Sequence, residues 1–205
     1  MNNRRIIFEV GANNGSDTER FAADSDAYVF SFEPSPILYP ICVERFKGRD
    51  NVLMLPIAID VENSIKPFNV SEQGDKGFGS LYDFHGNLLN TALQKYSEFN
   101  TPFSYKQNVL TMRLDSFIMQ YNIPRIDYLW IDAQGSDFNV LRSLGDQIDI
   151  VQEGRVECTY KIPLYTNEDN YYENIRTFLE DAGFTVSIDY VHANDSEIDL
   201  HFIRE

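Results

Sequence analysis

The segment IIFEVGANNGSDTERF combines an acidic residue with two glycines at a spacing that suits ligand binding. Glu9 ends an apolar run typical of a buried strand, and Gly11 and Gly15 follow before a helical pattern begins. Glycine lets the backbone approach a ligand closely, and the start of the following helix offers free amides. The G-x-G-x-x-G pattern of dinucleotide sites lacks its middle glycine here. An acid also repels a pyrophosphate, whereas it suits the sulfonium and ammonium groups of S-adenosylmethionine.

A second acid, Glu33, follows the next apolar run, in the segment FSFEPSP. A carboxylate at the end of the second strand accepts hydrogen bonds from the hydroxyls of a ribose. By itself, Glu33 is equally well explained as a solvated acid at a strand end. Two acids at the ends of adjacent strands, with a glycine turn between them, favour an adenosyl ligand.

Two further acids end apolar runs later in the chain. Asp132 lies in WIDAQGSDF, and Glu157 lies in RVECTY. Both should face the ligand pocket, because ligands of parallel sheets bind beyond the carboxyl ends of the strands. There the two carboxylates would hold Mg²⁺ or Mn²⁺, or they would act without a metal as a general base. A salt bridge between Glu157 and Arg155 or Lys161 is the structural alternative.

Strands alternate with helices along the chain, and this alternation would place all four acids at one edge of a sheet. The expected strands cover residues 6–10, 28–32, 51–59, 66–70, 108–113, 126–133, 154–160, 184–191 and 198–204. Ser16 and Ser136 are expected to cap two of the helices. The pattern predicts an α/β fold with a mostly parallel sheet and helices on both faces. Its antiparallel C-terminal hairpin is typical of the seven-stranded, Rossmann-like class I methyltransferase fold.

A less regular segment, residues 60–107, interrupts the alternation. It contains EQGDKGFGSLYDFHGN, with four glycines, and one helix is expected near residues 88–96. Long loops in compact domains are usually functional, so this insert should cover the acceptor site. Tyr82 and His85 are its candidate substrate contacts. Its aromatic residues would stack on a sugar ring or form a small core of their own.

Composition limits the class of protein. The 205 residues fit a single domain, and a hydrophobic content of 43% is sufficient for its core. Seventeen basic and 32 acidic residues give a net charge of −15, which argues against a nucleic-acid substrate. Without a signal peptide or an apolar run of membrane-spanning length, we expect a soluble, cytoplasmic protein. The sequence does not indicate an oligomeric state.

Several segments together resemble the FkbM family of S-adenosylmethionine-dependent O-methyltransferases. They are FEVGANNGSDT, SFEPSP, LPIAI, MRLDSF and IDYLWIDAQGSDFNVLRSLG, in this order between residues 8 and 157. The resemblance implies a cofactor site whose residues are Glu9, Gly11, Asn13, Gly15, Glu33, Ala58 and Asp132. In that site Glu33 would bind the ribose and Ala58 would line the adenine.

The chain departs from the family's K-I-D-x-E-G-x-E segment at two positions. Trp130 replaces the lysine, and Gln134 replaces the first glutamate, whereas Asp137 keeps the second acid. Cofactor binding is still expected, but these changes affect the part of the site that would activate the acceptor.

Methyl transfer from S-adenosylmethionine to a hydroxyl is the leading functional hypothesis. Known members of the family methylate hydroxyls of macrolide rings and deoxysugars, so the resemblance implies a sugar, a glycan or another small molecule as the acceptor. An NAD(P)-dependent oxidoreductase on a Rossmann-like sheet is one alternative. A non-catalytic adenosyl-binding protein is another.

Overall fold

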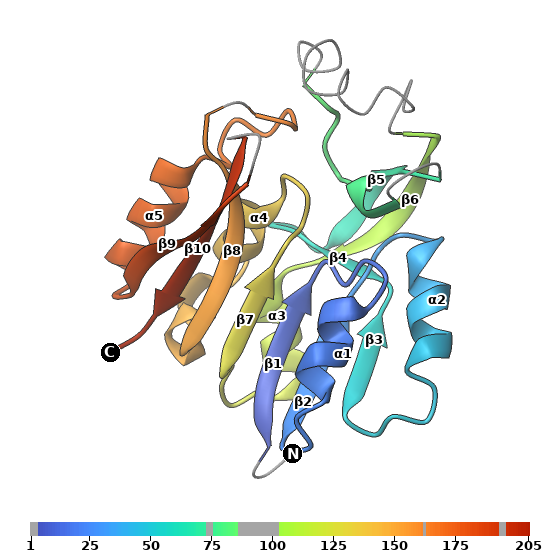
Figure 1. Ribbon diagram of the computed structural model, residues 1–205, viewed down its shortest axis with the longest axis horizontal. Coiled ribbons are helices and arrows are strands. Elements are labelled where there is room, and N and C mark those ends of the chain that lie inside the picture. The colour runs from blue at the N-terminus through green and yellow to red at the C-terminus, as the bar shows by residue number, and fades with distance from the viewer. Residues whose placement is uncertain (1–3, 73–75, 86–102, 162, 193–195) are drawn as a thin grey trace.

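Seven strands form the main sheet of the molecule, in the order β3-β2-β1-β7-β8-β10-β9 (Figure 1). The computed structural model describes residues 4–72, 76–85, 103–161, 163–192 and 196–205. The strands are β1 Arg5–Val10, β2 Ala27–Phe32, β3 Val52–Leu55, β7 Tyr128–Ile131, β8 Glu153–Thr159, β9 Thr185–Val191 and β10 Glu197–Ile203. β10 pairs antiparallel with both of its neighbours, and the other pairs are parallel. The predicted α/β sheet with its antiparallel C-terminal hairpin is confirmed.

Helices cover both faces of this sheet (Figure 1). They are α1 Ser16–Ala22, α2 Leu38–Arg45, α3 Leu114–Tyr121, α4 Asp137–Arg142 and α5 Tyr172–Asp181, with short 3₁₀ helices η1 Lys76–Phe78 and η3 Gly145–Ile150. Ala22 of α1 packs with Ile7 on one face. Side chains of α3, α4 and α5 join the larger core on the other face. Alternation along β1 explains the division, because successive residues of a strand point to opposite faces.

A smaller sheet of β4 Ile57–Ile59, β5 Ser64–Val70 and β6 Tyr105–Met112 lies beside the main one. The expectation of one continuous strand over residues 51–59 is therefore wrong. The chain leaves the main sheet at Pro56, whose nitrogen carries no hydrogen for a strand ladder. β3 before this proline pairs with β2, and β4 after it pairs with β6. The switch brings β4 to the edge of the ligand pocket described below.

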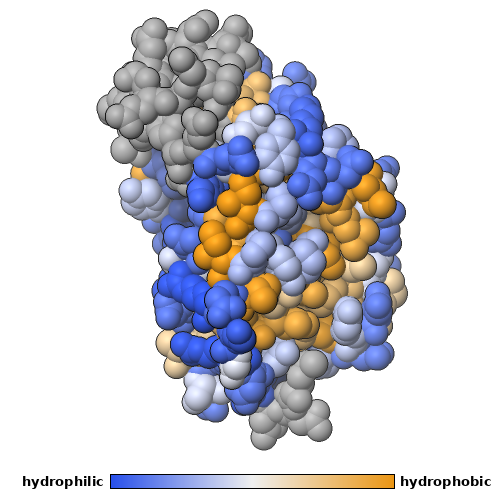
Figure 2. All heavy atoms as spheres, turned by 90° about the vertical axis from the view of Figure 1, so that its right-hand side faces the viewer, coloured by the Kyte–Doolittle hydropathy of each residue, from blue (hydrophilic) through white to orange (hydrophobic). Residues whose placement is uncertain are grey.

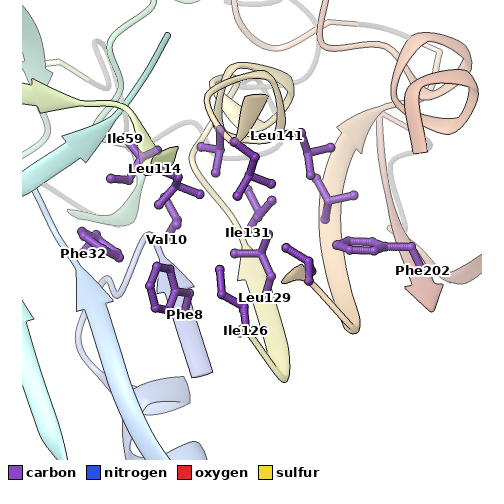
Figure 3. Packing of buried hydrophobic residues seen from close by; sticks show 14 of the residues in the cluster. Phe8, Val10, Phe32, Ile59, Leu114, Ile126, Leu129, Ile131, Leu141 and Phe202 are labelled. Carbon is purple, nitrogen blue, oxygen red and sulfur yellow. The ribbon is translucent and has the colours of Figure 1, made fainter. Parts of the chain in front are cut away.

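The larger core is built from aromatic and branched aliphatic side chains (Figure 3). The ring of Phe8 lies 5.1 Å from Phe30, 5.8 Å from Phe32 and 5.7 Å from Phe117, measured between centroids. Tilted and edge-on contacts of this kind stabilise a core beyond the area that they bury. These ring contacts join β1, β2 and α3 near the carboxyl ends of β1 and β2, where Glu9 and Glu33 lie.

One face of the molecule, over α2, β3 and the smaller sheet, shows a band of hydrophobic side chains (Figure 2). The exposed apolar residues of these elements include Ile41, Val43, Ile65 and Leu110. Among the residues that the structure describes, no helix is long and apolar enough to cross a membrane.

The expected cap at Ser16 is wrong, whereas Ser136 is the N-cap residue of α4, as predicted, but makes no side-chain capping bond within the described part of the chain. Gly15, with a φ of 81°, precedes α1, and the amide of Ser16 donates to Asn14 Oδ1 at 3.0 Å. A left-handed residue at this position does not give the extended geometry that a serine cap uses. Before α4, the carboxylate of Asp137 accepts hydrogen bonds from the amides of Ala133 and Gly135. The hydroxyl of Ser136 accepts no amide hydrogen bond from the described residues at the start of this helix. The helix expected near residues 88–96 lies outside the described residues.

Candidate cofactor and acceptor site

A pocket opens at the carboxyl ends of β1, β2 and β7. The pocket lies where the strand order reverses between β1 and β7, which is the usual ligand position in such sheets. The sequence-predicted residues on its wall are Gly11, Asn13, Glu33, Ala58 and Asp132.

Gly11 lets the first loop pass very close to the end of β7. Its φ is +94°, and a β-carbon at this position would lie 1.8 Å from the backbone oxygen of Asp132. Any other residue would therefore push the loop away from the pocket wall. Gly15 lies outside the wall and supports the loop from behind, since a β-carbon there would lie 2.7 Å from the ring of Phe46.

Glu33 presents a fixed carboxylate to the pocket. Its Oε2 accepts a hydrogen bond from the amide of Asn13 and its Oε1 accepts one from the amide of Ser35, both at 2.7 Å. Burial raises the pKa of Glu33 to about 7, while these two amide bonds oppose the rise. The side chain thus links the glycine loop to the end of β2 and is held at one orientation on the wall.

Glu9 lies behind the glycine loop and outside the wall of the pocket. Its Oε2 accepts hydrogen bonds from Thr18 Oγ1, at 2.5 Å, and from Ser31 Oγ. Its Oε1 is buried and has no hydrogen-bond partner within the described part of the chain. Burial raises the pKa of Glu9 to about 7, and the two hydroxyls lower it. Glu9 therefore ties β1 to α1 and β2 beneath the loop.

Gln134 stands between the two acids that were predicted to be catalytic. Its Nε2 donates to Asp132 Oδ1 at 2.7 Å and lies 3.5 Å from Glu157 Oε2. Its Oε1 accepts a hydrogen bond from the hydroxyl of Tyr165 at 2.5 Å. Burial raises the pKa of Asp132 and that of Glu157, and the carboxylate of Asp132 raises the pKa of Glu157 further. An amide in place of the family's usual glutamate gives these crowded acids a hydrogen-bond donor.

Asp137 matches the second acid of the segment K-I-D-x-E-G-x-E, and its carboxylate shapes the turn after β7. Its Oδ1 accepts from the amide of Ala133 at 2.6 Å, and its Oδ2 accepts from the amide of Gly135 and from Asn170 Nδ2, both at 3.1 Å. Burial raises its pKa to about 7. Because both oxygens are engaged, Asp137 holds the loop after β7 in place.

The sequence interpretation missed His192 and Asp199. His192 Nε2 lies 3.4 Å from Glu157 Oε1 and 3.4 Å from Asp199 Oδ1. Arg155 pairs with Asp199 and Asp189, which contradicts the structural alternative of a salt bridge from Arg155 to Glu157. The antiparallel register of β8 and β10 sets Asp199 opposite Glu157. The predicted hairpin of β9 and β10 could have suggested that His192 lies near Asp199, but the pairing of β10 with β8 that adds Glu157 has no local signal in the sequence.

The candidate substrate residues Tyr82 and His85 both lie outside the wall of the pocket. The hydroxyl of Tyr82 accepts a hydrogen bond from Asn139 Nδ2 at 2.6 Å. The amide of His85 donates to the backbone oxygen of Leu164 at 2.8 Å. These bonds tie the insert to α4 and to the loop after β8.

The aromatic residues of the insert pack on one another. The ring of Phe84 stacks on Tyr165 at 4.8 Å, and Phe78 and Phe103 complete the cluster. An earlier part of the insert lines the pocket itself, with Lys76, Gly77, Gly79 and Leu81. The insert therefore covers the same pocket that the glycine loop forms.

A family model described as the methyltransferase FkbM domain matches residues 9–186. The chain is also similar to the 2-O-methyltransferase NoeI of Sinorhizobium fredii (strain NBRC 101917 / NGR234). The two are 31% identical over 141 residues, which are 66% of this chain and 56% of NoeI. The chain thus spans a little over half the length of this curated relative.

Solved structures with the same fold cover nearly the whole chain. An rRNA methylase from Streptococcus thermophilus matches with a TM-score of 0.54 and 12% identity, over 98% of this chain and 87% of the other. TrmK of M. capricolum, in complex with S-adenosyl-homocysteine, matches with a TM-score of 0.54 and 11% identity, over 98% and 62%. Aeropyrum pernix fibrillarin, with bound S-adenosyl-L-methionine, matches with a TM-score of 0.52 and 10% identity, over 98% and 66%. The fold is that of the class I methyltransferases.

Proposed function

This chain belongs to the FkbM methyltransferase family, and from that premise we propose that it transfers a methyl group from S-adenosylmethionine to a hydroxyl of a sugar, a glycan or another small molecule. The observation that carries the proposal is one pocket wall with two acids, Glu33 at the end of β2 and Asp132 after β7. NoeI is named as a 2-O-methyltransferase, which supports oxygen as the methylated atom.

The residues of the pocket fit this cofactor. Ile57 and Ala58 offer an apolar surface for the adenine, and the Glu33 carboxylate suits the ribose hydroxyls. Ser136 also lines the pocket, and its buried hydroxyl has no hydrogen-bond partner among the described residues. A buried polar group of this kind normally binds something, so a ligand that contacts Ser136 would satisfy it.

When bound, S-adenosylmethionine supplies an activated methyl group. The chain's own contribution is to orient the reactants and to remove a proton. We assign the proton transfer to Asp132, which would accept the proton of the acceptor hydroxyl. Gln134 fixes the orientation of this carboxylate through the bond to Oδ1. The raised pKa of Asp132 brings it closer to the working pH, where a general base is most effective.

In the alternative arrangement, Glu157 and Asp132 would bind one Mg²⁺ or Mn²⁺. The position of Gln134 disfavours that arrangement, since its Nε2 group, rather than an oxygen, faces both acids. An N–H group donates hydrogen bonds and does not coordinate a cation. We therefore favour Asp132 as a base that acts without a shared metal, with Glu157 supporting Gln134.

A methyl-transfer screen tests the proposal. Protein and S-adenosylmethionine with a labelled methyl group are incubated with simple sugars and purified glycans, and the label is located in the product. We expect ether-linked label on a carbohydrate hydroxyl. Asp132→Asn should lower kcat by roughly 10²–10⁴-fold, the usual contribution of a general base.

The exposed acid Asp146 offers a matched control, and Asp146→Asn should keep the wild-type rate. A wild-type rate in Asp132→Asn would contradict the assignment of the base. Tight cofactor binding without turnover on any acceptor would favour the non-catalytic adenosyl-binding alternative.

A further inference from the structure

On the side of Glu157 away from Gln134, three potential metal ligands meet at the end of the sheet. Glu157 lies in β8, His192 directly follows β9, and Asp199 lies in β10. One donor atom from each lies within 4.8 Å of the others. We propose that Glu157, His192 and Asp199 bind a first-row divalent cation such as Mn²⁺. This site is independent of the proposed methyl transfer and differs from the Asp132–Glu157 pair considered above.

The two distances from His192 Nε2 to the carboxylates suit metal coordination better than hydrogen bonding. His192 Nε2 is equally far, at 3.4 Å, from Glu157 Oε1 and from Asp199 Oδ1. A charged N–H···O bond is normally about 2.7–2.9 Å long. Donors about 2.1 Å from one ion stand roughly 3.0–3.4 Å apart at octahedral or tetrahedral angles. The imidazole nitrogen thus faces two carboxylates across a gap that an ion would fill.

Both carboxylates are held by groups outside the three. Asp199 Oδ2 accepts a hydrogen bond from Arg155 Nη2, which leaves Oδ1 directed to His192. Glu157 Oε2 faces the amide of Gln134, which leaves Oε1 directed to His192. Outer partners of this kind orient the ligands of metal sites.

Charge and access also favour a cation. The carboxyl groups of Asp132, Asp137, Glu197 and Asp199 all act on Glu157, and the guanidinium of Arg155 pairs with Asp199. The side chain of His192 is 33% exposed, whereas those of Glu157 and Asp199 are 10% and 13% exposed. The group is therefore open to solvent on the histidine side, where an ion would enter.

The ligand set indicates the class of metal. Imidazole nitrogen suits Mn²⁺, Fe²⁺, Co²⁺ and Zn²⁺ better than Mg²⁺ or Ca²⁺, which take oxygen ligands. Three protein ligands also leave coordination positions for water or for a ligand hydroxyl.

Mn²⁺ titration of the EDTA-treated full chain tests the site without cofactor or acceptor. We expect one bound Mn²⁺ per chain by electron paramagnetic resonance, with a coupling from one imidazole nitrogen in the pulsed spectrum. Mn²⁺ should also raise the melting temperature, because a ligand that binds the folded state stabilises it. His192→Ala and Asp199→Asn should each weaken Mn²⁺ binding by more than about tenfold.

His201 is the matched control, because it is 32% exposed and lies 2.9 Å from one carboxylate, that of Glu153. His201→Ala should bind Mn²⁺ as the wild type does. If a variant does not fold, the nitrogen coupling and the rise in melting temperature of the wild type still test whether an imidazole binds Mn²⁺. No Mn²⁺ binding at millimolar concentration, bound Mn²⁺ without nitrogen coupling, or unchanged binding in His192→Ala would each overturn the proposal.

Discussion

At Gly11 the backbone passes so close to Asp132 that no side chain fits between them, which joins the first loop to the end of β7. Glu33 then joins that loop to the end of β2 through two amides. Gln134 joins Asp132 to Tyr165 on its other side. At the residue scale, the site is thus a series of short polar contacts that fix two carboxylates on one wall.

The first prediction concerns Glu33→Ala. It should weaken S-adenosylmethionine binding by roughly 1.5–3 kcal/mol, the scale of hydrogen bonds to a charged group. It should also lower stability, because the amides of Asn13 and Ser35 lose their acceptor. Calorimetry measures the affinity below the melting temperature of the variant, with Glu44→Ala on the exposed side of α2 as the control. Unchanged affinity would remove Glu33 from the cofactor site.

The second prediction concerns the pH dependence of stability without cofactor. Burial raises the pKa of Glu9 to about 7 from an ordinary value of 4.5, so between these pH values the folded state holds more protons than the unfolded state. Stability therefore falls as pH rises through this window, by up to about 3 kcal/mol for this one group. Glu9→Gln keeps an oxygen for Thr18 and Ser31 but cannot ionise, so the fall should be smaller.

Urea unfolding at pH 5 and at pH 8 measures this difference between the wild type and Glu9→Gln. The exposed substitution Glu44→Gln controls for the loss of one negative charge. An equal fall in all three proteins would show that Glu9 does not titrate in this window.

At the element scale, apolar runs and their spacing were enough to predict the main sheet. The buried strands β1 and β7 are largely apolar segments, and the acids at their ends, Glu9 and Asp132, mark the carboxyl edge of the sheet. Strands near β5 and β6 were also predicted, but their assembly into a separate sheet was not. That sheet depends on the break at Pro56 and on pairing between segments far apart in the sequence, which no local pattern encodes.

In the candidate site too, some residues could be predicted from local patterns and others could not. Gly11, Glu33 and Asp132 follow from local patterns, because each lies at a strand end. The position of Glu9 behind the loop depends on Thr18 and Ser31, which come from two other elements. Likewise, the grouping of His192 with Glu157 depends on how a hairpin pairs with β8. Tertiary contacts of this kind have no signature in a single segment.

The third prediction is that two parts of the insert have different effects, one on cofactor binding and one on use of the acceptor. Leu81 lines the pocket, so Leu81→Ala should weaken cofactor binding. Phe84 lies outside the pocket wall and stacks on Tyr165, whose hydroxyl holds Gln134 beside Asp132. Phe84→Ala removes an aromatic contact worth about 0.5–1.5 kcal/mol and should lower kcat/KM for the acceptor, with cofactor affinity unchanged. Calorimetry and steady-state kinetics measure the two effects, and loss of cofactor affinity in both variants alike would contradict this division.

At the scale of the whole molecule, both sheets and the insert contribute residues to the pocket that contains Glu33 and Asp132. The main sheet supplies the acids and the glycine loop, the smaller sheet supplies Ala58, and the insert covers both. The net charge of −15 leaves little reason for a polyanionic acceptor, since phosphate contacts need basic residues. This charge agrees with the proposed sugar, glycan or other small-molecule acceptor.

The binding of S-adenosylmethionine is the central claim, and thermal unfolding with competing cofactors tests it most directly. The protein is melted alone, with S-adenosylmethionine, and with NAD⁺ or NADP⁺ at the same concentration. A cofactor at 100 times its dissociation constant should stabilise the folded state by about 2.7 kcal/mol. The account predicts that S-adenosylmethionine raises the melting temperature of the wild type, that its effect is smaller in Glu33→Ala, and that neither nicotinamide cofactor changes the temperature. A rise with NAD⁺ or NADP⁺ alone would contradict it.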